Sequence, residues 1–180
     1  MHPFLEQYHK VAVPALRARF GYENVMSVPR VIKVVVNVGL SASQKDAKFP
    51  EVAESVLSRI TGQKPVKTLA KKSIANFKIR QGMVVGTKVT LRGPRMYDFL
   101  YKLVRTTLPR VRDFRGLSTG GMDGHGNLAI GFREYLPFPE IRSSEVERVH
   151  GLEIAIQTTA KSNDEALELF KQLGFPFQVK

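Results

Sequence analysis

Apolar and polar side chains alternate along three separate segments of the sequence, at residues 31–38, 84–92 and 152–160. Alternation with a period of two is typical of strands buried on one face only, whereas strands of a fully buried parallel sheet form continuous apolar runs. The apolar face of the first segment consists of Ile32, Val34, Val36 and Val38. The pattern predicts an α+β fold with two layers, in which helices cover one face of a mainly antiparallel sheet and leave the other face open.

Four segments show helical periodicity, and two shorter ones favour strands. Helices are predicted at residues 3–20, 49–61, 93–108 and after the capping box Ser162–Glu165, and short strands at 65–69 and 128–133. Pro14 should kink or divide the first helix, and Pro109 should stop the third. Residues 136–150 carry no clear pattern. Because no repeat, low-complexity tract or linker interrupts the chain, residues 1–180 are expected to form a single domain.

The positive charge of the chain is concentrated in its middle third. The formal net charge is +12, yet the segment from Arg59 to Arg115 alone carries 15 Lys or Arg against two acids, a balance of +13. Such a block repels itself unless a polyanion neutralises it, so nucleic acid is the expected partner. A membrane surface would require a basic amphipathic helix with a wide apolar side. The block is mostly strand-like and turn-like, so no membrane association is expected.

Several classes of site are excluded by composition. The chain has no cysteine, so it has no disulfide, no cysteine-ligated metal and no thiol nucleophile, which fits a reducing compartment. No apolar run is long enough to span a bilayer, and the N-terminus does not resemble a signal peptide. The four histidines lack metal-ligand spacing, and the flanking glycines would hold Asp123 and His125 poorly as a catalytic pair. We therefore expect no catalytic residue, metal or cofactor.

The open face of the predicted sheet has the side chains of an RNA-binding surface. It would present Lys33, Asn37, Lys88, Thr90 and Arg92, with Gln157 and Thr159 as further candidates. Lysine and arginine contact phosphates, whereas asparagine, glutamine and threonine reach sugar hydroxyls and base edges. The alternative for any single member is an ordinary solvated position, so the prediction depends on the set as a whole.

A second candidate is the segment at residues 70–83, because a hairpin loop usually takes only about 2–5 residues. It carries four cations interleaved with three large apolar residues: Lys71, Lys72, Lys78 and Arg80 with Ile74, Phe77 and Ile79. Basic residues around an aromatic suit contact with a nucleic-acid backbone together with base stacking. The alternative is a mobile loop whose apolar residues fold back onto the domain. A further basic cluster, Arg110, Arg112 and Arg115, precedes a glycine-rich stretch and could equally be a solvated surface.

Six blocks in order connect the sequence with a known family. They are Pro29–Gly39, Thr61–Ser73, Val89–Gly93, Leu108–Gly116, Gly124–Asn127 and Phe138–Ile141. With these blocks the chain resembles, over essentially its whole length, the bacterial large-subunit ribosomal protein five family, which binds 5S rRNA.

The resemblance implies a non-catalytic structural role in the ribosome, in the cytoplasm. Members of the family anchor 5S rRNA in the central protuberance of the large subunit, among large-subunit rRNA and neighbouring ribosomal proteins. They place an extended loop near the P-site tRNA. They also contact small-subunit ribosomal protein thirteen in an intersubunit bridge.

The resemblance also implies site residues. The rRNA-binding residues would include Asn37, Gln63, Thr68 and Thr90, which agree with the open face at Asn37 and Thr90 and are joined there by Lys33, Lys88 and Arg92. The tRNA-contact loop would be the 70–83 segment, with Lys71, Lys72, Phe77, Lys78 and Arg80. Four acids that could face a basic partner would form the bridge: Glu134, Glu140, Glu145 and Glu147.

Two other readings stay open at the level of sequence. One is a generic basic module that binds RNA or DNA without a fixed ribosomal position. The other is a hydrolase acting on nucleic acid, whose only support is the basic charge and for which Asp123 would be the residue to test.

Overall fold

The computed structural model describes residues 2–40, 48–141 and 149–178. The chain divides into two compact units. The first unit comprises Met1–Val34, Leu91–Ile130 and Ala155–Lys180, and the second comprises Val35–Thr90 and Gly131–Ile154. Glu145 and Glu147, two of the predicted bridge residues, lie outside the described residues.

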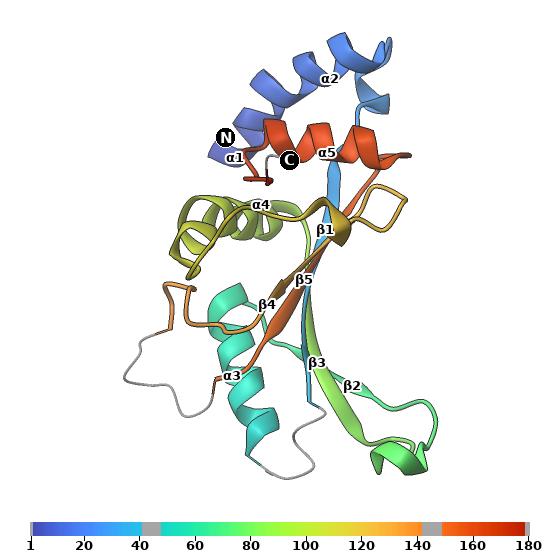
Figure 1. Ribbon diagram of the computed structural model, residues 1–180, viewed down its shortest axis with the longest axis vertical. Helices are drawn as coiled ribbons and strands as arrows, with labels where there is room; N and C mark the ends of the chain where they lie inside the picture. The colour runs from blue at the N-terminus through green and yellow to red at the C-terminus, as the bar shows by residue number, and fades with distance from the viewer. Residues whose placement is uncertain (1, 41–47, 142–148, 179–180) are drawn as a thin grey trace. The chain divides into compact units, whose positions relative to one another are not determined.

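Five strands form a single sheet, coloured from blue to red along the chain in Figure 1. The strands are β1 (Val31–Gly39), β2 (Val66–Leu69), β3 (Val84–Leu91), β4 (Leu128–Phe132) and β5 (Leu152–Thr158). Their order across the sheet is β2-β3-β1-β5-β4. Strand β2 pairs antiparallel with β3, and the Leu40 N–H, just after β1, donates to the Val85 carbonyl near the start of β3. The Thr159 N–H, after β5, likewise donates to Arg30 before β1. The antiparallel α+β prediction is confirmed.

Helical segments fill most of the remaining described chain. The α-helices are α1 (Pro3–Gln7), α2 (Val13–Phe20), α3 (Phe49–Thr61), α4 (Gly93–Lys102) and α5 (Asn163–Gln172). The π-helical turns are η1 (Tyr8–Ala12) and η5 (Leu103–Thr107), and the 3-10 turns are η2 (Val25–Ser27), η4 (Ala75–Phe77), η6 (Leu108–Arg110) and η7 (Thr119–Gly121). No helix within the described ranges has both the length and the apolar character needed to cross a bilayer.

The two prolines occupy similar positions. Pro14 divides the first predicted helix, as expected, with the π-helical turn η1 immediately before α2. Pro109 lies in the first turn of η6, directly after the π-helical turn η5. Helical backbone ends at Arg110, one residue after Pro109 and close to the predicted stop.

In the first unit, the long-range contacts join the two ends of the chain. The Gln7 side-chain amide donates to the Gln172 carbonyl at 2.8 Å, and Arg19 pairs with the largely buried Glu168 of α5. The predicted stripe of the third helix is fully buried, at Met96, Phe99, Leu100 and Leu103. The serine half of the capping box is confirmed, because Ser162 Oγ accepts the Glu165 N–H at the start of α5. The Glu165 side chain accepts the Lys161 N–H at 2.9 Å, one residue before the expected donor.

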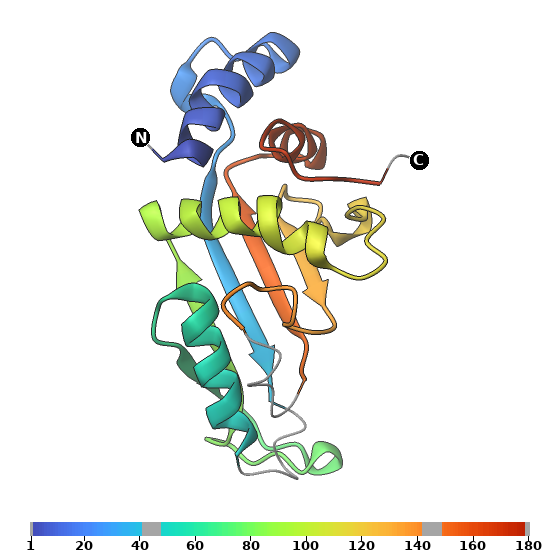
Figure 2. The same ribbon diagram turned by 90° about the vertical axis from the view of Figure 1, so that its left-hand side faces the viewer.

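In the second unit, α3 covers one side of the strands (Figure 2). Its predicted stripe is buried, at Phe49, Ala53, Val56 and Ile60. Val36 and Val38 of β1 and Val89 of β3 are each at most 1% exposed. No α-helix among the described residues of this unit lies on the opposite side of the strands (Figure 1). The predicted open face is therefore present in this unit.

The start of β1 departs from the predicted alternation. Ile32 was expected to be buried with Val34 but is 38% exposed, whereas Val31 is only 7% exposed. Alternation shows which residues share a face of a strand. It does not show how far along the strand each face is covered, because coverage depends on tertiary packing.

The glycine-rich loop before β4 is held by one carboxylate. Asp123 Oδ1 accepts the N–H groups of His125 at 2.8 Å and Asn127 at 3.0 Å, and Oδ2 accepts the Asn127 side-chain amide at 2.6 Å. Asn127 Oδ1 in turn accepts the Thr158 N–H at the end of β5. The Asn127 amide, followed by these backbone donors, lowers the pKa of Asp123 below its ordinary value.

This loop should make stability depend on pH. A carboxylate whose pKa is lowered by folding stabilises the fold above its unfolded pKa of 3.8 and loses that contribution as pH falls through the folded value. We expect the free energy of unfolding of the wild type to fall more steeply below about pH 4 than that of Asp123→Asn, measured by urea denaturation at several pH values. The control Asp113→Asn removes another exposed carboxylate, one with no hydrogen bond to the described residues. Parallel curves for the wild type and Asp123→Asn would contradict the prediction.

Candidate nucleic-acid interface

Three residues form a row across the open face of the second unit. In the β2–β3 register Thr68 lies opposite Gly86, and Val66 lies opposite Lys88. A Cβ atom placed on Gly86 would be 2.6 Å from Thr68 Oγ1 and 3.9 Å from Asn37 Oδ1. The polar atoms of Thr68 and Asn37 therefore both lie near the bare backbone of β3, and a side chain at Gly86 would displace the Thr68 hydroxyl.

The side of the sheet to which this row belongs follows from Lys67. Lys67 Nζ lies 3.4 Å from a carboxylate oxygen of Glu54 on α3, so Lys67 points toward the helix. Successive side chains of a strand point to opposite faces, which directs Thr68 away from α3. Gly86, Lys88 and Thr90 of β3 share the side of Thr68. Lys88 is exposed and Thr90 is half-buried, so both can be reached from solvent.

The end of α3 brings Gln63 to the backbone of β3. Helix α3 ends at Gly62, whose φ of 65° is left-handed and whose N–H donates to the Ser58 carbonyl. The Thr61 hydroxyl accepts the Gln63 N–H at 3.3 Å. The Gln63 side-chain amide then donates to the Thr90 carbonyl at 3.3 Å. The structure thus brings together Asn37, Gln63, Thr68, Lys88 and Thr90 within the second unit.

The remaining predicted sheet residues belong to the first unit. Lys33 is half-buried in β1, and Arg92 is exposed immediately before α4. Gln157 is half-buried. The hydroxyl of Thr159 accepts the Arg30 N–H at 2.9 Å, so it is already engaged with the backbone.

The 70–83 segment is an ordered extension of the β2–β3 hairpin, seen at the lower right of Figure 1. The Ala70 N–H donates to the Met83 carbonyl, and Ile74 and Ile79 exchange both backbone hydrogen bonds. The Ser73 hydroxyl accepts the Gln81 N–H at 2.9 Å. The turn η4 closes the tip, and Lys78 follows it with a φ of 54°.

The side chains of this extension face solvent. All four cations, Lys71, Lys72, Lys78 and Arg80, are exposed. Phe77 is 66% exposed and Ile74 is 44% exposed. The alternative in which the apolar residues fold back onto the domain does not fit these values for Phe77 and Ile74. The hairpin tip offers cations beside an aromatic ring, which suits RNA backbone contact with base stacking.

The described part of the predicted bridge is anchored by aromatic packing. The ring of Tyr135 lies 4.6 Å from that of the buried His150, and Phe132 lies 5.7 Å from Phe138. Glu134 and Glu140 are both half-buried. Arg59 of α3 donates to the Glu140 carbonyl at 2.8 Å, which fixes this segment against the helix.

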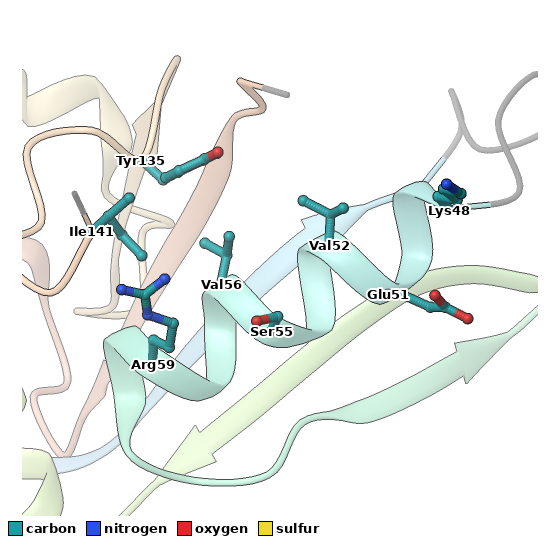
Figure 3. A pocket seen from close by; sticks show the side chains of 8 residues that line it. All are labelled: Lys48, Glu51, Val52, Ser55, Val56, Arg59, Tyr135 and Ile141. Carbon is teal, nitrogen blue, oxygen red and sulfur yellow. The ribbon is translucent and has the colours of Figure 1, made fainter. Parts of the chain in front are cut away.

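Beside that segment lies a groove of about 390 Å³ (Figure 3). Val52 and Val56 of α3 and Tyr135 and Ile141 supply its apolar lining, and Arg59 lies toward Ile141. The other lining residues are Lys48, Glu51 and Ser55. The groove combines α3 with the 135–141 segment, so it is distinct from the open face.

Asp123 and His125, considered above as a catalytic pair, contribute to the structure of the glycine-rich loop instead. The Asp123 carboxylate accepts the backbone N–H of His125, not a proton from its ring. Among residues 2–40, 48–141 and 149–178, no three His, Asp or Glu side chains gather in a way that could hold a metal ion.

Gly86 is the residue of this face that the sequence analysis did not single out. An isolated glycine within a strand signals a bulge or a close approach of backbone, and that signal was present. The structure has both features, because the register shifts between Thr68 and Leu69 and the Thr68 hydroxyl lies over Gly86.

Comparison with known proteins identifies the family of the chain. The family model of ribosomal protein L5 matches residues 24–80, and the model of the ribosomal L5P family C-terminus matches residues 84–177. A protein of Halothermothrix orenii named large ribosomal subunit protein uL5 is 56% identical over 177 residues, covering 98% of this chain and 99% of the relative. Proteins with the same name from a Thermoanaerobacter species and from Fervidobacterium nodosum are 54% and 51% identical, each over 96% of the relative and at least 96% of this chain. The chain therefore belongs to the ribosomal protein L5 family.

Proposed function

We propose that the open face of the second unit binds 5S rRNA and anchors it in the central protuberance. As a member of its family, the chain is a structural, non-enzymatic constituent of the large ribosomal subunit, and its place is in the ribosome in the cytoplasm. The observation that carries the proposal is the row of Thr68, Gly86 and Asn37 beside exposed Lys88, on a face that no described α-helix of this unit covers.

The chemistry of that row suits the ribose side of an RNA. Thr68 supplies a hydroxyl that donates or accepts, and Asn37 supplies an amide that does both. A ribose 2′-hydroxyl also donates and accepts, and it is the group that distinguishes RNA from DNA. Both polar groups lie near Gly86, so one sugar can contact them together. Lys88 lies two residues further along β3, where it can contact a phosphate.

The hairpin tip is proposed to contact the P-site tRNA. Support comes from its ordered backbone and its four exposed cations around Phe77. A contact made by an already ordered segment costs less conformational entropy than one made by a disordered loop.

The acidic segment that contains Glu134 and Glu140, together with Glu145 and Glu147, is proposed to face small-subunit ribosomal protein thirteen in an intersubunit bridge. Support comes from the four acids in a chain whose net charge is +12. Large-subunit rRNA and neighbouring ribosomal proteins complete the proposed surroundings.

A generic basic module is the second candidate, and competition separates the two. The proposal expects 5S rRNA to displace labelled 5S rRNA at a concentration at least about tenfold lower than an unrelated RNA or a DNA duplex. Equal competition by all three would favour the generic module.

The open face should lose RNA affinity when its lysine is neutralised. Lys88→Gln should weaken 5S rRNA binding, and the log–log slope of affinity against salt should become shallower by about 0.7–0.9, because one phosphate contact is removed. Filter binding at several salt concentrations measures both quantities. Lys67→Gln is the matched control, since Lys67 lies on the neighbouring strand but points toward Glu54. Equal effects of the two substitutions would contradict the assignment of the face.

Substitutions in the hairpin tip should weaken tRNA contact without weakening 5S rRNA binding. The double substitution Lys78→Glu with Arg80→Glu should leave 5S rRNA affinity within about twofold, because Lys88 and the polar groups of the open face are untouched, and should weaken tRNA contact in reconstituted ribosomes. Chemical footprinting of the P-site tRNA measures that contact. Loss of 5S rRNA affinity in this variant would reverse the assignment.

The left-handed backbone of Lys78 should lower the local stability of the hairpin, although its side chain is needed for tRNA contact. A left-handed conformation costs a residue with a side chain roughly 1 kcal/mol more than glycine. Lys78→Gly should therefore raise the hydrogen-exchange protection of the Ile74 and Ile79 amides by up to about fivefold, while weakening tRNA contact. Lys72→Gly, in the same hairpin but without a positive φ, should not raise protection. Unchanged or lower protection in Lys78→Gly would contradict this.

A further inference from the structure

We propose that the outer edge of strand β2 binds an extended, acidic segment of a partner protein, which adds to the sheet as a further strand. β2 (Val66–Leu69) is the outermost strand of the five-stranded sheet on the side of β3 (Figure 1). The proposal goes beyond RNA binding by the open face. It does not rest on that function, because it concerns the edge of the sheet and not its face.

Backbone geometry shows which residues of β2 direct their polar groups outward. In an antiparallel strand the N–H and C=O of one residue point to the same side, and successive residues alternate. The Val85 carbonyl accepts the Leu40 N–H and so faces β1. Gly86 therefore faces β2, where Thr68 lies opposite it. Thr68 is thus paired with β3, and the backbone groups of Lys67 face outward.

The other end of β2 leads to the same result. The Ala70 N–H donates to the Met83 carbonyl, and the Ala70 carbonyl accepts the Gly82 N–H, so both groups of Ala70 face the hairpin partner. Leu69, one residue earlier, therefore directs its N–H and carbonyl outward. No hydrogen bond joins the backbone of Lys67 or Leu69 to a loop or helix in the described chain. An added strand bonds with every second residue of its neighbour, and these two residues meet that requirement.

Large apolar side chains lie uncovered at this edge. Val66 is 62% exposed and Leu69 is 56% exposed. Among the large apolar residues of the described strands only Ile32 is also exposed, at 38%. Proteins usually protect an edge strand with charged side chains. The one charge within β2, Lys67, lies 3.4 Å from a carboxylate oxygen of Glu54 on α3, so it points toward the helix and leaves the outer edge accessible.

The charge around the edge selects the partner. Three exposed lysines flank β2, with Lys64 before it and Lys71 and Lys72 after it. The sequence has no acid between Glu54 and Asp98, so nothing within this segment balances them. A second copy of the chain on this edge would place lysine against lysine, which disfavours self-pairing. An acidic strand is attracted by the same three charges.

A peptide matches this edge better than an RNA strand does. The RNA backbone accepts hydrogen bonds through its phosphates and donates only through its ribose 2′-hydroxyls, so it does not reproduce the regular alternation of donors and acceptors that a peptide offers. Val66 and Leu69 are aliphatic, so they provide no ring on which a base could stack. Addition of a strand to a sheet edge is an established mode of peptide recognition.

Binding of a labelled nine-residue peptide of alternating glutamate and valine, followed by fluorescence anisotropy, tests the proposal in the full-length protein. The control peptide has the same side chains but a methyl group on every backbone nitrogen, so it cannot donate hydrogen bonds. It should bind at least about fivefold more weakly, because each lost hydrogen bond costs roughly two- to tenfold in affinity. Equal binding of the two peptides would overturn the proposal, because charge alone would then account for binding. So would a failure of the unmodified peptide to bind.

Substitutions at the edge should weaken binding of the unmodified peptide. Leu69→Glu should do so at least about fivefold, because it removes an apolar contact and repels the acidic strand. Val25→Glu is the matched control, since it alters a 50% exposed apolar residue of the first unit and changes the net charge equally. It should change the affinity less than about twofold. Because Leu69 belongs to the strand itself, Lys71→Gln with Lys72→Gln serves as a second variant and should weaken binding at least about threefold. Equal thermal unfolding midpoints should show that all three variants fold. Equal losses in Leu69→Glu and Val25→Glu would contradict the proposal.

Hydrogen exchange locates the contact on the backbone. With saturating peptide the amides of Lys67 and Leu69 should gain at least about fivefold in protection, whereas the Thr68 amide, already paired with β3, should change less. Protection of Lys67 and Leu69 in the free protein that is lost on dilution would assign the edge to a second copy of the chain and overturn the proposal. Equal protection by an oligouridine RNA of the same net charge as the peptide would also overturn it.

Discussion

Strand β3 separates two environments at alternate residues. Thr87 and Val89 are each 1% exposed on the side that α3 covers, whereas Lys88 between them is open to solvent. This division is a consequence of strand geometry, since neighbouring side chains point to opposite faces. Burial of the apolar side supplies the stabilisation of the unit. The side chains of the other side are not needed for this packing. They can therefore include residues suited to binding, such as Gly86, Asn37 and Lys88.

The elements whose signals are local could be predicted from the sequence. The stripe of α3, the alternation of β3 and the capping box at Ser162 each depend on residues a few positions apart, and each matches the structure. The features that were missed depend on contacts between distant residues. The exposure of Ile32 depends on where covering helices end, and the bond from Gln63 to Thr90 depends on how α3 meets β3. The family resemblance grouped Asn37 with Thr68, but their position on either side of Gly86 required the structure, because alternation does not show which strands are neighbours.

The cations of the middle third have two different roles. Lys67 and Arg59 hold α3 to its neighbours, the first through Glu54 and the second through the Glu140 carbonyl. The four cations of the hairpin tip, Lys71, Lys72, Lys78 and Arg80, are exposed instead. Counting charges in the sequence could not separate these roles, because a lysine in a strand faces a helix or solvent according to its register. The excess charge of the block is thus distributed among several surfaces.

The pairing of Leu117 with Phe177 joins residues 60 positions apart as neighbouring parallel segments. The bonds from Leu117 to Pro176 and from Gln178 to Leu117 are made by the last few described residues of the chain. The segment before Leu117 and the segment after α5 therefore hold each other in position, and loosening either one would release both.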